Sequence, residues 1–189
     1  MGIHSYKLPT LVAFAAAAAI AATPSFAAGP SLVNINVTGV DSTDIEDSLS
    51  NVYSSISLDP NALITGISWN VQLMANAPSW LNELTVVFGS TAVPKSLYLN
   101  PGDGDQFSGT KSYASAGMID LVAAGLDFAV GADGQLKWQF FDSFNDLGGI
   151  DGKWLAGTIS VQVIPEPGTY GLMALGLLAV AAAARRRSA

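Results

Sequence analysis

The chain has 189 residues, a formal net charge of −7 and no cysteine, so disulfide bonds, thiolate nucleophiles and cysteine-bound metals are excluded. Between residues 28 and 164, four lysines face fourteen aspartates and glutamates. A region this acidic is not expected to bind nucleic acid, and anionic membranes repel it. Its length is that of one domain, large enough to bury a hydrophobic core.

The first 27 residues are predicted to be a secretory signal peptide. Lys7 and His4 give a weakly basic start, an apolar run covers residues 11–22, and small residues stand at positions 25 and 27. Signal peptidase selects small side chains there, so cleavage is predicted between Ala27 and Ala28. The alternative is an uncleaved anchor helix. Because His4 is the only histidine, the processed protein would contain none.

Residues 28–164 are predicted to form an all-β domain, because short runs in which apolar and polar residues alternate are separated by turn residues. The clearest run, 64–74, places Ile67, Trp69, Val71 and Leu73 on one face. Nine runs are predicted to be strands: 33–38, 52–58, 64–74, 84–88, 96–99, 118–122, 126–130, 136–140 and 158–163. The pattern favours an antiparallel β-sandwich of about nine strands, jelly-roll-like, without an amphipathic helix.

Two details of this domain are predicted from local chemistry. The Asp-Gly pair at 133–134 lies between two predicted strands and is typical of a tight hairpin turn. The aromatic residues Trp69, Trp138 and Phe140 alternate with polar neighbours, so they are expected to point into the core.

After the last predicted strand come Pro165-Glu166-Pro167-Gly168, an apolar run over 170–184, and Arg185-Arg186-Arg187. Neither a helix nor a central strand continues through the two prolines. The apolar run is predicted to be a hydrophobic helix that enters the membrane, and the arginines remain with water and anionic headgroups. As a helix it spans about 22 Å, which is short for a permanent anchor.

In this order of motif, apolar span and basic end, residues 165–189 resemble the PEP-CTERM sorting signal of exported bacterial proteins. The resemblance implies recognition and removal by an exosortase-type membrane enzyme. It also implies export through the inner membrane to the cell envelope or extracellular matrix. An ordinary membrane anchor is the alternative interpretation.

A weaker resemblance concerns the domain itself. From residue 134 onward the chain has, in order, a glycine and a tryptophan on a strand (residues 134–142), an acidic loop with Asp146, a second tryptophan (Trp154) and a last strand with Ile159. Residues 67–88 match the earlier part of the same pattern. The segment is similar to the end of P-domain-like jelly rolls, which implies a jelly roll and no particular activity.

Two kinds of residue are candidates for ligand contact. Trp80 and Trp154 lie in predicted loops, where an exposed indole would stack on a sugar ring; the alternative is partial burial as a lid over one end of the sandwich. Calcium is the second candidate, since it prefers several oxygen ligands from a flexible loop. The acids concerned are Asp103 and Asp105 in one loop and Asp142, Asp146 and Asp151 in another. The alternative is that they fill turns and keep the surface soluble.

No catalytic machinery is predicted; the alternative is a hydrolase in which a pair of carboxylates cleaves glycosides, although any acidic sandwich offers such pairs. Without histidine or cysteine after residue 27, catalytic triads and histidine-bound zinc are excluded. We therefore expect a non-enzymatic structural or interaction protein of the envelope or matrix, with no resident cofactor. The alternative is a carbohydrate-binding module for exopolysaccharide, with or without calcium.

Overall fold

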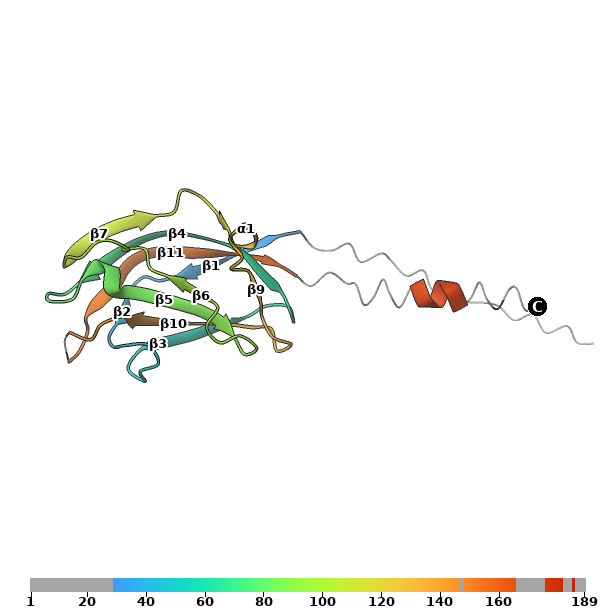
Figure 1. Cartoon of the computed structure of the whole chain (residues 1–189), viewed down its shortest axis with the longest axis horizontal. Coiled ribbons are helices and arrows are strands. Elements are labelled where there is room, and N and C mark those ends of the chain that lie inside the picture. Colours follow the sequence, from blue (N-terminus) through green and yellow to red (C-terminus); the bar gives the residue numbers. More distant parts are fainter. Residues whose placement is uncertain (1–28, 147, 166–175, 182–184, 186–189) are drawn as a thin grey trace, which may run out of the picture. The chain divides into compact units, whose positions relative to one another are not determined.

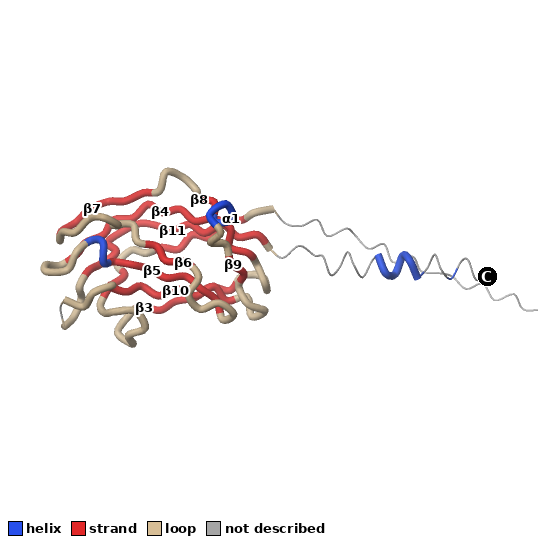
Figure 2. The backbone as a smooth tube through the Cα atoms, viewed as in Figure 1, coloured by secondary structure: helices blue, strands red, loops and turns tan. Residues whose placement is uncertain are grey.

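The computed structural model describes residues 29–146, 148–165, 176–181 and 185 (Figure 1). The chain divides into two compact units, one formed by Phe26–Tyr170 and the other by Met1–Ser25 with Gly171–Ala189. In the first unit, the described residues form two layers of antiparallel β-sheet (Figure 2). The prediction of an all-β antiparallel sandwich is confirmed.

The larger sheet has four main strands in the order β1 (Ser31–Asn36), β11 (Gly152–Ile164), β4 (Leu63–Ala75) and β7 (Gly109–Ala114). Three short strands extend it: β2 (Val40–Ser42) on β11, and β8 (Ile119–Asp120) and β9 (Phe128–Ala129) on β4. The smaller sheet has the order β3 (Val52–Ser57), β10 (Gln135–Asp142), β5 (Leu84–Ser90) and β6 (Leu97–Leu99). Because β3, β4 and β5 alternate between the layers, as do β9, β10 and β11, the two sheets are interleaved in sequence, which is typical of a jelly roll.

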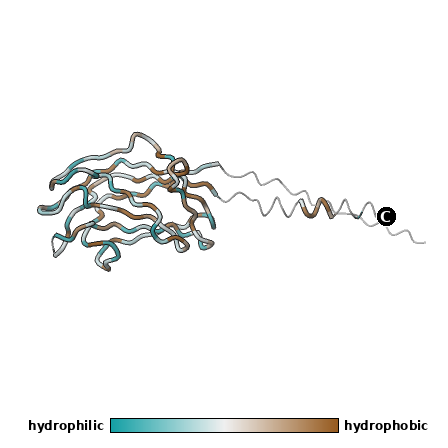
Figure 3. Tube along the Cα trace, in the orientation of Figure 1, coloured by the Kyte–Doolittle hydropathy of each residue, from teal (hydrophilic) through white to brown (hydrophobic). Residues whose placement is uncertain are grey.

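The core lies between the two sheets, as the alternation of the strands requires. On β4 and β11, Ile67 pairs with Val161, and both side chains are buried. On β10 the buried residues Leu136, Trp138 and Phe140 are separated by residues that face the opposite side. Apolar residues recur along the strands of both sheets (Figure 3). The predicted inward faces of β4 and β10 are confirmed, although Trp69 is only partly buried against the core.

The described part of the domain has eleven strands instead of nine, because β2 and the six-residue β7 were not predicted. The predicted strands 118–122 and 126–130 are reduced to the two-residue β8 and β9. The last strand begins at Gly152, six residues before its predicted start. A Cβ at position 152 would lie 2.7 Å from the Met74 carbonyl oxygen, so only glycine lets β11 approach β4 this closely.

Two predictions about local structure are wrong. Residues 118–122 are not one strand: β8 ends at Asp120, whose side chain accepts a hydrogen bond from the Ala123 amide and begins the one-turn helix α1 (Leu121–Ala124). Gly125, with a φ of 68°, ends that helix. The turn at 131–134 does not close a hairpin either, because β9 pairs in the larger sheet and β10 in the smaller one. A short 3-10 helix, η1 (Leu81–Glu83), precedes β5.

The predicted flanking helices fall largely outside the described residues. The signal peptide, residues 1–27, lies wholly outside them, and so does most of the predicted membrane segment 170–184. Residues 176–181 of that segment are helical. Within the described portion of the chain, no helix has the length and apolarity needed to cross a bilayer.

Candidate functional site

The predicted sorting residues lie at the end of β11 and beyond it. Pro165 directly follows the last strand residue, Ile164, and is half-buried. Arg185 is helical and exposed. The remaining residues of this prediction lie outside the described residues: Glu166, Pro167, Gly168, Arg186 and Arg187, together with the predicted signal cleavage site at Ala27 and Ala28.

The two candidate tryptophans have different environments. Trp80 is 41% exposed and stands before η1, where its backbone amide donates to the Glu83 carboxylate at 2.7 Å. Trp154 is fully buried on β11, and its ring meets the Phe140 ring edge-on with centroids 5.1 Å apart. Because β11 begins earlier than predicted, Trp154 points into the core and is not available to stack on a sugar ring.

In the first candidate calcium loop, Asp105 is held by two other side chains. Asp105 accepts hydrogen bonds from Lys111 Nζ and from the Tyr113 hydroxyl, each at 2.6 Å. These contacts lower the pKa of Asp105. Asp103 is exposed two residues away. Both residues therefore have the turn and surface environment that was the alternative to calcium binding.

The second group of acids is split between core and surface. Asp142 and Asp151 are fully buried, whereas Asp146 is half-buried. Asp142 accepts hydrogen bonds from the Ser79 hydroxyl at 3.2 Å and the Phe144 amide at 3.1 Å. Burial raises the pKa of Asp142 to about 7, and the charges of Glu83 and Asp151 act in the same direction. Across the described ranges, no three acidic or histidine side chains are placed to hold one metal ion.

A concave site lies elsewhere, on the outer face of the smaller sheet. We call it the sheet-face groove; its volume is about 550 Å³. Strands β3, β10 and β5 form its floor, and the segments around Asp47 and 90–95 form its walls. Its lining residues are Asp47, Tyr53, Ser54, Ser55, Val87, Ser90, Thr91, Pro94, Lys95, Lys137, Trp138 and Gln139.

Strand register explains why these side chains meet. Since Trp138 and Phe140 point into the core, Lys137 and Gln139 face outward. Gln139 is paired with Tyr53 on one side and with Val87 on the other, and Val87 is paired in turn with Tyr98 of β6. One row of outward residues therefore crosses all four strands of the sheet. A second row pairs Ser55 with Lys137.

Gln139 is the unusual member of this row. Its side chain is 5% exposed, and its Nε2 donor has no hydrogen-bond partner among the described residues. More than nine in ten buried polar groups in folded proteins are hydrogen-bonded. The floor of the groove thus holds a desolvated donor without an acceptor.

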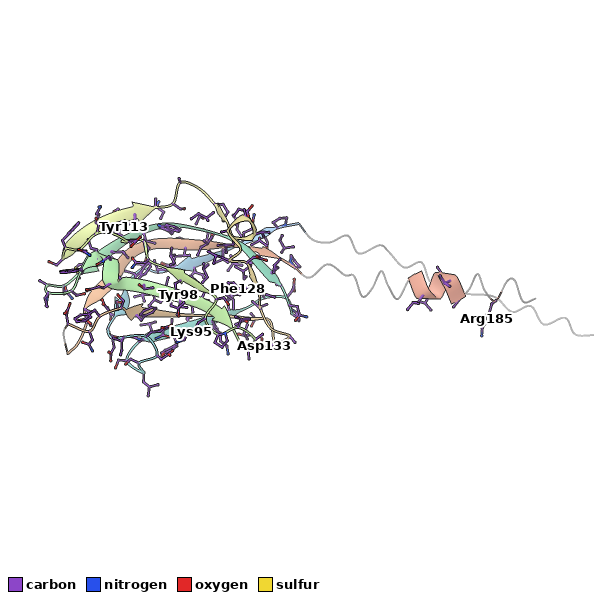
Figure 4. All side chains as sticks on the ribbon, viewed as in Figure 1. Lys95, Tyr98, Tyr113, Phe128, Asp133 and Arg185 are labelled. Atoms are coloured by element: carbon purple, nitrogen blue, oxygen red, sulfur yellow. The ribbon has the colours of Figure 1, made fainter. Side chains whose placement is uncertain are left out.

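The two walls of the groove are joined by a charged contact. Lys95 Nζ lies 2.6 Å from Asp47 Oδ2 and 3.2 Å from Glu46 Oε1. The hydroxyl of Tyr98 donates to the same Glu46 oxygen at 2.8 Å. Lys95 and Tyr98 are labelled beside the strands of the smaller sheet in Figure 4. These contacts hold the segment 43–51 against the loop between β5 and β6, and they raise the pKa of Lys95.

Two tyrosines give this face an aromatic surface. Tyr53 is 52% exposed and Tyr98 is 51% exposed. Their hydroxyls are anchored, that of Tyr53 to the Ser48 carbonyl oxygen at 3.0 Å and that of Tyr98 to Glu46. Burial raises the pKa of both phenols, and neighbouring carboxylates raise it further. The hydroxyls therefore stay neutral, and the rings are fixed in place.

The pairing of β10 with β3 and β5 was not predicted from the sequence, so the groove was missed. The available signal was the alternation of residues 135–139, which marks Gln135, Lys137 and Gln139 as one polar face. That pattern identifies a solvent-facing strand, but it does not indicate that residues from β3 and the loop after β5 cover Gln139.

No curated protein matches the chain. Among solved structures, the VP2 subviral particle of infectious bursal disease virus is 11% identical, with a TM-score of 0.38, over 82% of this chain and 37% of that chain. The Gx strain of the same virus gives 12% identity and a TM-score of 0.41, over 79% and 38% of the two chains. The chain thus spans just over a third of the length of these viral proteins.

The tobacco streak virus coat protein is 9% identical, with a TM-score of 0.28, over 77% of this chain and 92% of that one. These resemblances to viral capsid proteins are weak and carry no functional argument. The resemblance of residues 134–159 to P-domain-like jelly rolls stays a prediction. The comparison that bears on function concerns the segment from the end of β11 onward: residues 163–187 match the PEP-CTERM protein-sorting motif, as the sequence predicted.

Proposed function

We propose that this is an exported, non-enzymatic interaction protein of the cell envelope or extracellular matrix, delivered there through its PEP-CTERM tail. The observation that carries the proposal is the match of residues 163–187 to the sorting motif, which implies processing by an exosortase at the membrane. Signal peptidase would remove residues 1–27 first. The sandwich would then be released from, or retained at, the outside of the membrane.

The assignment of a binding role is supported by the chemistry of the domain. The chain has no cysteine, and no histidine follows His4. The strongly acidic composition of the domain favours solubility and disfavours nucleic-acid binding. The groove on the smaller sheet has a volume within the range of small-molecule sites. Binding of exopolysaccharide, with or without calcium, remains the second candidate, and the half-exposed Trp80 is its first proposed contact.

The sorting role is tested by deleting residues 165–189 and fractionating the producing cells. The deletion is expected to remove the protein from the envelope and matrix fractions, either into the medium or to the periplasm. The matched control is the full chain carrying Gln135→Met, a change in the sandwich outside the groove that should leave the location unchanged. If the truncated and complete proteins fractionate identically, the tail does not direct sorting.

A further inference from the structure

We propose that the sheet-face groove binds carbohydrate, with an oxygen of a sugar accepting a hydrogen bond from Gln139 Nε2. This rests on the interaction role proposed above and assigns that role a place and a ligand class. The proposal is based on Gln139. This residue lines the groove and is 5% exposed, and its amide donor has no hydrogen-bond partner among the described residues.

The buried amide indicates a ligand because its free state is unfavourable. A buried donor without an acceptor destabilises a fold, and an apolar side chain of similar shape would avoid the cost. Val87, the residue paired with Gln139 on the groove floor, is such an apolar side chain and is 4% exposed. Nε2 is closed to solvent in the free protein, so we infer that the amide turns toward the groove and gains its missing acceptor when a ligand oxygen enters.

The surrounding groups select for a polyhydroxylated molecule. The side chain of Ser55, which pairs with the outward-facing Lys137, brings a hydroxyl to the groove that can both donate and accept, and the hydroxyl of Thr91, which donates to Asp133, can still accept. Tyr53 presents an anchored, half-exposed ring beside Gln139, suited to the apolar face of a sugar ring. Such a combination of a few fixed polar groups with an aromatic ring is what orients a small neutral ligand.

The charges of the groove argue against phosphate-rich ligands. Lys95 is already held by Asp47 and Glu46, so its charge is balanced within the wall. Lys137 makes no ion pair with a described side chain and is the single lysine left to meet a carboxylate. A neutral sugar, or one that carries a single uronate group, fits this balance. An extended peptide would pair with a strand edge, whereas the groove lies on a sheet face.

The test is a calorimetric titration of the full-length chain, purified in detergent, with neutral and uronate oligosaccharides from disaccharides to hexasaccharides. We expect one series to bind the natural chain, and Gln139→Met to weaken that binding about 10-fold, the effect of one hydrogen bond. The matched control is Gln135→Met, which lies on the same face of β10 but outside the groove and should bind normally. In NMR spectra, the side-chain amide signal of Gln139 should shift when the sugar is added.

The proposal would be overturned by no oligosaccharide binding, by equal binding of Gln139→Met, or by loss of binding in Trp80→Ala with the groove variants unaffected. Binding of a peptide in place of a sugar would also contradict it. None of these outcomes depends on where the protein is delivered. A failure of the groove is therefore distinguished from a failure of the sorting role, which is measured by fractionation of the tail deletion.

Discussion

Replacing Gln139 with methionine should stabilise the ligand-free protein. The methionine side chain has a similar length and no branching, so it fills the same space on the groove floor without a polar group. The unpartnered Nε2 of Gln139 costs about 1–3 kcal/mol as a desolvated donor. Relieving that cost should raise the free energy of unfolding by about 1–2 kcal/mol, which for a domain of this size is an increase in Tm of about 3–8 °C.

The measurement is thermal and urea unfolding of the full-length natural chain and its variants in the same detergent, followed by tryptophan fluorescence. The control Gln135→Met removes a partly exposed amide that already donates to Ser57 Oγ at 2.8 Å. It should change the free energy of unfolding by no more than about 0.5 kcal/mol. If Gln139→Met is instead destabilised by 1 kcal/mol or more, on the same order as a lost hydrogen bond, the amide is satisfied in the free protein and the reasoning is refuted.

Three further predictions concern the core, the buried acid and the groove walls. Trp154→Ala should destabilise the fold by about 3–5 kcal/mol in urea titrations, whereas Trp80→Ala should cost far less; equal effects would contradict the core role of Trp154. The pKa of Asp142 is raised to about 7 from 3.8, so the folded protein keeps a proton that the unfolded chain loses. The free energy of unfolding should therefore fall as the pH rises from about 4 to about 7, and in urea titrations this fall should be smaller for Asp142→Asn. An equal fall in the variant would mean that other groups cause the pH dependence. Lys95→Met should alter the stability little, because the ion pair is exposed to solvent, but it should speed hydrogen exchange in residues 43–51; unchanged exchange would mean that the charged contact does not hold the walls together.

The parts of the fold that depend on local periodicity were predictable. Strand β4 is half-buried along 13 residues, and the alternation of Ile67, Val71 and Leu73 with polar residues is visible in the sequence. The helix α1 was missed although its signals are also local. Asp120 as its N-cap and Gly125 as its C-cap are typical of a helix, but a single turn is too short to show helical periodicity.

The features that were not predictable depend on contacts between distant segments. Trp154 is buried because β11 begins at Gly152 and places Trp154 opposite Leu73 and Val40. The groove requires Gln139 to be paired with both Tyr53 and Val87, residues more than fifty positions away. In contrast, the sorting tail was identified from the sequence alone because its motif, apolar span and basic end are contiguous.

The central claim is that a tail-directed, exported protein leaves a processed sandwich domain outside the membrane. It is tested most directly by the intact mass of the protein recovered from the envelope or matrix of the producing cells. We expect a species that begins at Ala28 and has lost the apolar segment after Pro165-Glu166-Pro167. Recovery of the complete 189-residue chain, with both apolar segments in place, would contradict it.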